Sequence, residues 1–388
     1  MDFIDNSGVG SLIKNEQINF VGVAITPWHA HGIDCAIKYL QNNGVEVKGV
    51  VIISLAVKQG KITHLLTEDN FVNTCCKYYK REAIFDTSVK HILETLKDNY
   101  LAAKVYNNQN PNGRPLYIAT AWHPNINLLM SLHNHLGAGY NFKMMVVEEG
   151  LSTYFPQVKS WKHVWNTTKT SKKGISLVMS VLLRQFSSWL IARFENNTQW
   201  TNLNLLLGQD KGLHPNPLAT KYYRKVLTEF SRKNVQQYAI PDLNGCIVIC
   251  TMAYMHSEIE NDSDVTSLTA VMKALQQAGN TVYIKPHPRD VDYRQRYAPL
   301  CCQFIDVPYS VETLMVKFPH IKAIVSFSST SLVTAKMLFG INAISILNII
   351  EQEKYGDYIK DEMKSFVACF SNLVNIPKDI DEMAKILS

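Results

Sequence analysis

The chain of 388 residues is predicted to fold as an α/β protein built from two consecutive units, each with a parallel sheet. Two observations predict this class. In both halves, short apolar runs alternate with helix-length segments, which is the order that a parallel sheet covered by helices requires. Between the halves, the turn-forming run Pro241 to Gly245 interrupts this rhythm before it restarts. The length allows two domains, each with its own core.

The first half contains four buried-type strands and two helices. The strands are expected at residues 18–24, 45–55, 116–121 and 142–147, and the helices at 33–41 and 125–135. The segment between the first strand and the first helix, which carries His29 and His31, is expected to be a loop. Residues 151–241 are less regular, although residues 174–194 look helical. That helix is expected to pack beside a cleft, with an interfacial helix on anionic lipid as the alternative.

The second half repeats the alternation. Strands are expected at residues 246–251, 280–284, 304–307, 323–325 and 341–347, and helices at 263–277, after the Ser326 turn to about 339, and at 379–387. The pattern therefore predicts two Rossmann-like halves that face each other. The expected domains are residues 1–240, which include a basic insertion, residues 241–370, and a C-terminal helical segment, 371–388.

The composition is that of an ordinary globular protein, with 46% hydrophobic and 19% charged residues. No uncharged apolar run reaches 18 residues, and residues 1–15 lack the features of a signal peptide, so we expect a cytoplasmic protein. The eight cysteines include no CxxC pair, which indicates reduced thiols and no zinc site. No GxGxxG or P-loop motif supports a dinucleotide or NTPase site.

Positive charge is concentrated in one segment. The net charge is +6, and residues 151–194 contain no Asp or Glu. The basic residues of this segment are Lys159, Lys162, Lys169, Lys172, Lys173, Arg184 and Arg193. Such a segment favours an acidic partner: a polyanionic substrate, nucleic acid or an anionic membrane surface. A solvated basic face is the alternative, and no nucleic-acid-binding motif is present.

An acidic pair follows the strand at residues 142–147. Side chains alternate along a strand, so only one of Glu148 and Glu149 can face a cleft as a general base. The other is expected to anchor the loop. Gly150 permits a sharp turn or a close substrate. An acidic turn without catalytic function is the alternative.

Three further clusters lie at strand or helix ends in the second half. Lys285-Pro286-His287-Pro288 is a rigid basic turn after a strand, suited to a phosphorylated group, where His287 can donate a hydrogen bond or a proton. The hydroxyl-rich turn Ser326 to Ser331 opens a helix and is expected to bind phosphate. Glu312, in the first turn of another helix, can accept both ribose hydroxyls of a nucleotide, or simply complement the helix dipole.

Two other patterns are weaker. Asp262-Ser263-Asp264 fits a metal-binding DxD pattern, but its place before a helix favours an N-cap. His29, His31 and His123 lie at the ends of N-terminal strands. For these histidines, contact with the acceptor and a purely structural role are both alternatives.

Taken together, Glu148-Glu149-Gly150, His287-Pro288 and Ser328-Ser329 resemble the three short motifs of the bacterial sialyltransferases, in the same order and approximate spacing. The chain length, the Lys-Pro-His-Pro context and the basic middle are most similar to the capsular polysialyltransferases, and next to the lipooligosaccharide sialyltransferases. The resemblance implies a GT-B architecture and inverting, metal-independent transfer of sialic acid from CMP-sialic acid, with no cofactor.

The resemblance also implies residue roles. Glu149 would be the general base on the acceptor hydroxyl, and His287 would protonate or stabilise the departing CMP phosphate. The implied donor-binding residues are Lys285, Pro288, Glu312, Ser328, Ser329 and Thr330. The expected acceptor-binding residues are His123, Lys162, Lys169, Lys172, Lys173 and Arg193.

The basic segment then fits a polysialic acid acceptor, a polyanion with one carboxylate per sugar. Capsular polysialic acid synthesis is therefore the first reading. The partners that follow are CMP-sialic acid and this acceptor, with peripheral contact at the inner membrane face or the capsule-assembly machinery, and no nucleic acid. The alternatives are a single-addition lipooligosaccharide sialyltransferase on a galactoside, another GT-B enzyme that uses a UDP- or GDP-sugar, and a non-catalytic module that binds acidic glycan or membrane.

Overall fold

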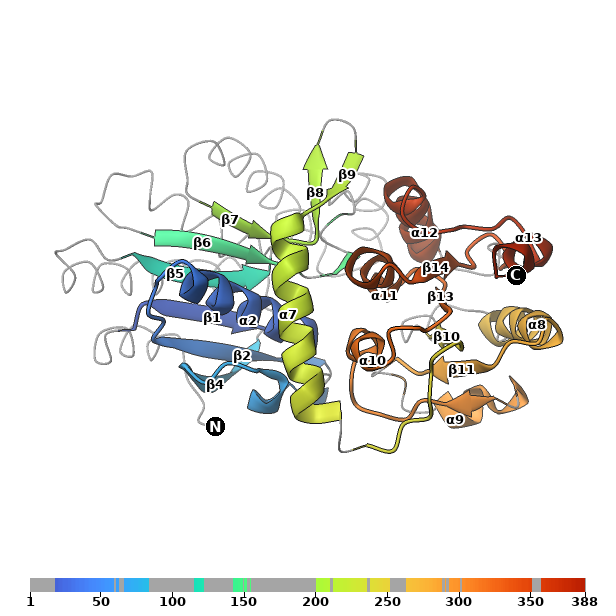
Figure 1. Cartoon of the computed structure of the whole chain (residues 1–388), viewed down its shortest axis with the longest axis horizontal. Coiled ribbons are helices and arrows are strands. Elements are labelled where there is room, and N and C mark those ends of the chain that lie inside the picture. Colours follow the sequence, from blue (N-terminus) through green and yellow to red (C-terminus); the bar gives the residue numbers. More distant parts are fainter. Residues whose placement is uncertain are drawn as a thin grey trace, which may run out of the picture. The chain divides into compact units, whose positions relative to one another are not determined.

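A computed structural model describes two compact α/β units of the chain (Figure 1). The described residues are 18–58, 61–62, 66–83, 115–121, 142–148, 150–151, 154, 200–209, 212–235, 238–251, 263–287, 290, 293–300, 302–350 and 357–387. The N-terminal unit comprises Met1–Glu149 and Pro156–Asn204, and the C-terminal unit comprises Gly150–Phe155 and Leu205–Ser388.

The N-terminal unit is built on a parallel sheet. Its elements are β1 (Phe20–Ala24), α2 (Pro27–Asn42), β2 (Gly49–Lys58), β3 (Lys61–Ile62), η1 (Glu68–Asn70), β4 (Cys76–Ala83), β5 (Leu116–Ala121), β6 (Phe142–Val147) and β7 (Trp200–Leu203). The parallel strands follow the order β4-β2-β1-β5-β6-β7, and the short β3 pairs antiparallel with the end of β2. This is the 3-2-1-4-5-6 strand order of a Rossmann fold.

The start of α2 corrects one expectation. Residues 26–32 were expected to form a loop, but Thr26 is the N-cap of α2, and its side chain accepts a hydrogen bond from the backbone N–H of His29. Pro27 occupies the first helical turn, where its missing N–H has no cost. His29 and His31 therefore lie inside the helix, and both are buried.

The C-terminal unit contains a second parallel sheet. Its strands are β10 (Ile247–Cys250), β11 (Val282–Lys285), β12 (Gln303–Phe304), β13 (Ala323–Ser326) and β14 (Asn342–Ser345). Its helices are α7 (Pro217–Asn234), α8 (Ser263–Gln277), α9 (Tyr293–Arg296), η5 (Ala298–Leu300), α10 (Val311–Lys317), α11 (Thr330–Thr334), η6 (Ala335–Phe339), α12 (Asp357–Phe370) and α13 (Ile380–Leu387). A separate hairpin is formed by β8 (Leu206–Gln209) and β9 (Gly212–Pro215).

The strand order of this sheet, β12-β11-β10-β13-β14, is the five-stranded Rossmann order 3-2-1-4-5. Figure 1 shows α8 and α13 on one side of the sheet and α10 and α11 on the other. The order reverses between β10 and β13, because β11 and β12 lie on one side of β10 while β13 and β14 lie on the other. Such a switch point is where open α/β sheets bind ligands, at the carboxyl ends of the strands.

Helix α7 belongs to the C-terminal unit, although the sequence placed residues 205–240 with the first half. The Ser231 hydroxyl donates to the carbonyl of Thr313 (3.4 Å), and the Tyr309 hydroxyl donates to the carbonyl of Asn234 (3.1 Å). The Arg224 Nε also donates to the carbonyl of Leu338. The compact units therefore divide after Asn204, and the expected domain boundaries stay a prediction.

The α/β class and the two Rossmann-like units are confirmed. The strands β5 and β6 and the helix α8 occupy the residues that the sequence predicts, whereas α7 and α12 were not anticipated. The facing arrangement of the two halves stays a prediction. Within the described part of the chain, no helix is long and apolar enough to span a bilayer.

Candidate active site

The candidate site lies at the carboxyl edge of the C-terminal sheet, at its switch point. The Ser326 hydroxyl, at the end of β13, donates to the carbonyl of Cys250 at the end of β10 (2.8 Å). Both residues are buried, and burial raises the pKa of the Cys250 thiol to about 12, so the thiol is neutral at physiological pH. This hydrogen bond joins the carboxyl ends of β10 and β13. The segments that follow the two strands therefore begin next to each other.

The His287 turn is attached to the same point. The backbone N–H of His287 donates to Oγ1 of Thr251, the residue after β10, over 2.9 Å. A tight turn follows, in which the N–H of Asp290 donates to the carbonyl of His287 (2.9 Å). Thr251 is buried and His287 is half-buried, so the histidine backbone is fixed beside β10. The backbone of His287 is therefore held at the carboxyl edge of the sheet, next to the switch point.

The serine-rich turn leaves β13 and enters α11. Ser329 is the N-cap of α11: its hydroxyl oxygen accepts from the N–H of Ser331 (3.3 Å) and lies 2.7 Å from the Ser331 hydroxyl. Ser328 is buried, and Ser329 and Thr330 are half-buried. The cap shows that one serine shapes the turn. The turn also carries the hydroxyls of Ser328 and Thr330, and hydroxyl groups and backbone N–H groups at a helix start are donors of the kind that phosphate prefers.

Glu312 approaches this helix from α10. Its carboxylate Oε1 accepts a hydrogen bond from the Thr334 hydroxyl on α11 (2.8 Å). Glu312 is only 6% exposed, in the first turn of α10, as the sequence predicts. The structure therefore brings Glu312 into contact with the helix that follows the serine-rich turn.

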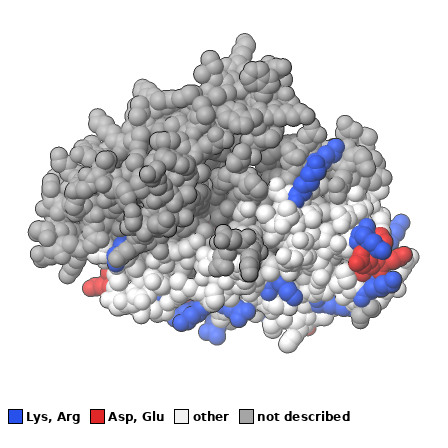
Figure 2. Space-filling view, turned by 90° about the horizontal axis from the view of Figure 1, so that it is seen from above, with Lys and Arg blue, Asp and Glu red and all other residues white. Residues whose placement is uncertain are grey.

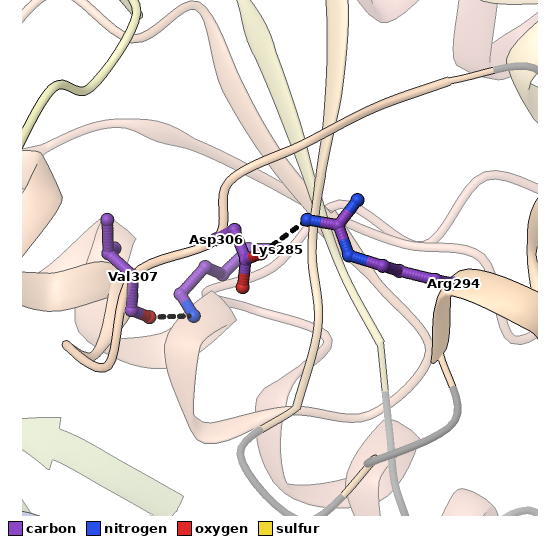
Figure 3. Close-up of polar contacts among 4 residues, drawn as sticks. All are labelled: Lys285, Arg294, Asp306 and Val307. Atoms are coloured by element: carbon purple, nitrogen blue, oxygen red, sulfur yellow. Dashed lines mark hydrogen bonds and ion pairs between the residues drawn. The ribbon is translucent and has the colours of Figure 1, made fainter.

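Lys285 has a different setting from the other candidates. Its Nζ donates to the carbonyl of Val307 (2.9 Å), and the side chain is 8% exposed (Figure 3). Burial lowers the pKa of Lys285, and the negative charges of Asp306 and Glu312 oppose that shift. Asp306 pairs with Arg294 on the other side of the lysine (Figure 3). Lys285 thus joins β11 to the segment after β12, and its proposed donor contact is untested.

The acidic motif is described in part. Glu148 is buried, with 1% exposure, directly after β6. Glu149 lies outside the described residues, but Gly150 and Leu151 are described and belong to the C-terminal unit. The N–H of Leu151 donates to Oγ1 of Thr330 over 3.3 Å.

Other candidates also fall outside the described residues. These are His123, Pro288, Lys162, Lys169, Lys172, Lys173 and Arg193, and so their roles stay predictions. Conversely, Thr251 and Thr334 were not anticipated. Thr251 could have been found by a rule like the one that selected His287, since it is the last residue of a predicted strand. Thr334 carries no sequence signal, because its contact with Glu312 depends on the packing of α10 against α11.

The described geometry defines a class of protein. A Rossmann-like sheet carries a histidine turn, a hydroxyl-rich turn and a buried carboxylate at its switch point, which is the arrangement of a nucleotide-binding α/β enzyme. The family model described as alpha-2,8-polysialyltransferase (POLYST) matches residues 125–348, more than half of the chain. The chain belongs to this family. It is a glycosyltransferase and a sialyltransferase, acting with a nucleotide-sugar donor and a glycan acceptor.

Solved structures of low sequence identity are also similar. A galactoside alpha-2,3-sialyltransferase from Photobacterium phosphoreum is 12% identical, with 94% of this chain and 98% of that chain covered and a TM-score of 0.47. A UDP-GlcNAc 2-epimerase from Methanocaldococcus jannaschii is 11% identical, with 95% and 98% covered and a TM-score of 0.48. At these TM-scores neither similarity carries an argument about function. No curated protein matches the chain significantly.

Proposed function

We propose that this chain extends capsular polysialic acid by transferring sialic acid from CMP-sialic acid to the non-reducing end of an oligosialic or polysialic acceptor. The observation that carries the proposal is the convergence of His287, Glu312 and the Ser328–Thr330 turn on one sheet edge, in a chain of the alpha-2,8-polysialyltransferase family. These groups match the features of CMP. The serine-rich turn suits its single phosphate, Glu312 suits its ribose, and His287 suits the proton that the phosphate can take up when CMP leaves.

In the proposed reaction, Glu149 takes the proton from an acceptor hydroxyl, and the hydroxyl oxygen attacks the anomeric carbon of sialic acid. The bond from that carbon to the CMP phosphate oxygen breaks with inversion, and the electron pair leaves with CMP. His287 protonates or electrostatically stabilises the phosphate. The backbone bond from His287 to Thr251 supports this role, because a fixed donor loses little entropy when the transition state forms.

The same geometry supports the donor contacts that we propose. We assign Ser328, Ser329 and Thr330 to the phosphate and Glu312 to the ribose hydroxyls, with Lys285 and Pro288 shaping the turn that carries His287. A single phosphate needs only neutral N–H and O–H donors and basic side chains, so we propose a metal-independent reaction without a cofactor.

The acceptor is proposed to lie along the basic segment. Lys162, Lys169, Lys172, Lys173 and Arg193 would pair with successive sialic acid carboxylates, and His123 would contact the acceptor end. On the described part of the face in Figure 2, Lys and Arg are more frequent than Asp and Glu, which is compatible with an anionic acceptor. We propose a cytoplasmic location with peripheral contact at the inner membrane face, where a cytosolic donor and a growing chain meet.

The test is transfer to a fluorescent oligosialic acceptor with CMP-sialic acid, with products separated by anion exchange. A ladder of many additions is expected, and an α2,8-specific endosialidase should digest it, since the family description names that linkage. Glu149→Ala should abolish the ladder. Neutralising the lysines of the basic segment should shorten the products or raise the acceptor KM while sparing donor hydrolysis.

Two outcomes would contradict this proposal. A single addition to a galactoside acceptor, without a ladder, would support the single-addition alternative. An equal loss of donor hydrolysis and transfer in the lysine variants would remove the basic segment from the acceptor site.

A further inference from the structure

The segment after the acidic pair is built into the unit that carries the donor-binding candidates. Residues Gly150–Phe155 belong to the C-terminal unit, although the strand before them, β6, belongs to the N-terminal unit. Leu151 is 8% exposed and lies in the hydrophobic core of the C-terminal unit. The Tyr154 ring packs edge-on against Phe370 of α12, at 5.9 Å between ring centroids.

Hydrogen bonds hold the same segment. The backbone N–H of Leu206 donates to the Tyr154 hydroxyl oxygen (3.1 Å), and the Cys369 thiol donates to the Tyr154 carbonyl (3.6 Å). The N–H of Tyr154 donates to the Leu151 carbonyl (3.0 Å), which closes a tight turn. Leu151 and Tyr154 are thus anchored by core packing and by several hydrogen bonds.

The first anchor after Glu149 is Thr330. Its Oγ1 accepts the hydrogen bond from the Leu151 N–H (3.3 Å). A Cβ on Gly150 would lie 3.0 Å from the same Oγ1, a contact tight enough that the Thr330 side chain would have to shift by a few tenths of an ångström. Gly150 also has a φ of +118°, in the region that favours glycine. Glycine at residue 150 therefore serves the approach of the backbone to Thr330.

We infer that Thr330 is a positioning residue, which fixes the backbone that carries the acidic motif against the phosphate-binding turn. Consecutive Cα atoms are about 3.8 Å apart, so fixing Gly150 restricts where the backbone of Glu149 can lie. Thr330 is also the first residue of α11, next to the N-cap Ser329. Thr330 thus holds the backbone that directly follows Glu149 in the chain, and it belongs to the turn that we assign to the donor phosphate. This inference rests on the proposed function.

The chemistry of a hydroxyl allows both contacts at once. The oxygen of Thr330 accepts from Leu151, while its hydrogen can donate to a phosphate oxygen. A loss of positioning should therefore be visible in the transfer step beyond any loss of donor affinity. An error of about 1 Å in the position of a catalytic group can cost about 100-fold in rate.

The experiment compares Thr330→Val with Thr330→Ser in the full-length chain. Valine keeps the shape but removes the acceptor, and serine keeps the acceptor. Thr330→Val is expected to lower kcat for transfer at saturating donor at least 10-fold, and this loss should exceed the factor by which the Kd for CMP, from calorimetry, rises, because the hydroxyl that valine removes is also assigned to the phosphate. Thr330→Ser should stay within 3-fold of the wild type in both. Thr269→Val is the matched control, since its Oγ1 donates to the Val265 carbonyl within its own helix, and it should change neither.

A double-mutant cycle tests the contact itself. Gly150→Ala adds the Cβ that meets Thr330, and it also strains the backbone. Thr330→Ala removes the oxygen but leaves the backbone strain of Gly150→Ala unchanged, so the strain cancels in the cycle. The rate penalty of Gly150→Ala should be at least 3-fold smaller in the Thr330→Ala background than in the wild type. Melting temperatures confirm that each variant is folded.

Three outcomes would overturn the inference. These are wild-type kcat in Thr330→Val, a loss of kcat fully matched by a loss of CMP affinity, and equal penalties for Gly150→Ala in both backgrounds. The proposed function is tested separately by the transfer activity of the wild-type chain. An active wild type with an unaffected Thr330→Val would therefore reject the inference alone.

Discussion

Glu312 makes a direct side-chain bond from its own helix to another helix of the site. Its carboxylate is buried, and the Thr334 hydroxyl donates to one of its two oxygens. A carboxylate can accept further hydrogen bonds at the same time, so the Thr334 bond orients the group and leaves capacity for a ligand. This is the arrangement expected of a carboxylate that accepts the hydroxyls of a ribose.

We therefore expect Glu312→Gln to weaken CMP binding by about 10- to 100-fold, because hydrogen bonds to a charged group contribute about 1.5–3 kcal/mol. The measurement is calorimetry with CMP and with 2′-deoxy-CMP. If Glu312 contacts the ribose, the penalty of the substitution should shrink several-fold for the deoxy ligand. Thr334→Val, which removes the orienting bond and a second bond to the Ser331 carbonyl but keeps the carboxylate, should show a smaller loss.

An equal penalty for both ligands in Glu312→Gln would contradict a contact with the 2′-hydroxyl. It would leave the carboxylate either with a contact to the 3′-hydroxyl alone or with a structural role in joining α10 to α11.

At this scale the sequence predicted which residues lie at strand ends, but not what they touch. His287 and Ser328 were predicted because prolines and clustered hydroxyls mark the end of an apolar run. The buried hydrogen bond from Lys285 to the Val307 carbonyl was not predictable. A lysine in a proline-containing turn at a strand end is equally compatible with a ligand contact and with a structural bond. The bond between Leu151 and Thr330 joins residues 179 positions apart, and only the fold brings them together.

Helix α2 buries two titratable side chains whose pKa values are shifted in opposite directions. Burial lowers the pKa of His31 from 6.5 to about 4. Burial raises the pKa of Asp34 from 3.8 to about 6, although hydrogen bonds from the N–H groups of Val72 and Asn73 partly oppose the shift. These bonds attach α2 to the segment that leads into β4.

The two shifts have opposite effects on stability. Between pH 6.5 and pH 4, His31 binds a proton in the unfolded state but stays neutral in the folded state. The free energy of unfolding therefore falls by about 3 kcal/mol as the pH drops from 6.5 to 4. Asp34 holds a proton in the folded state between pH 3.8 and 6, so stability rises by about 3 kcal/mol as the pH falls through that window. The two contributions nearly cancel.

We expect the wild-type N-terminal unit to change little in stability between pH 7 and pH 4 on account of this pair. His31→Asn removes one contribution, so the variant should gain about 3 kcal/mol over the same range, owing to Asp34 alone. Hydrogen exchange of the β1 and β2 amides, corrected for intrinsic rates, measures this. His320→Asn, at an exposed position, is the control and should retain the wild-type profile.

A His31→Asn profile parallel to that of the wild type would show that His31 does not resist protonation in the folded state. The same helix illustrates a limit of sequence reasoning. A Pro-Trp-His-Ala-His-Gly run after a strand suggests a loop, but Thr26 and Pro27 are also a helix start, and the tertiary burial of both histidines favours the helix.

For the whole molecule, the strand and helix rhythm predicted two parallel sheets correctly, because hydrophobic runs of strand length repeat in both halves. The strand orders were not readable, since they depend on which strands pair rather than on local pattern. The assignment of α7 also needed the fold: its Asn216 N-cap and amphipathic pattern define a helix, but only its bonds to Thr313 and Leu338 tie it to the second unit.

The division of the chain has a functional consequence, because every described donor candidate lies in the C-terminal unit. His287, Glu312 and the Ser328–Thr330 turn all belong to residues 205–388. A ligand that binds only the folded state stabilises it by RT ln(1 + [L]/Kd), which is about 2.7 kcal/mol at 100 times the Kd. CMP should therefore protect the C-terminal unit, and the effect should begin at the ends of β10, β11 and β13.

We expect hydrogen exchange with saturating CMP to slow at Thr251, His287 and the start of α11, and to leave β1, β2 and α2 unchanged. UDP and GDP should protect the same segments much less, because their uracil or guanine base and second phosphate differ from those of CMP. Glu312→Gln under the same CMP concentration is the control, and it should show reduced protection. Protection of β1 and β2 without protection of α11 would place the nucleotide in the N-terminal unit, and equal protection by UDP would favour a different sugar donor.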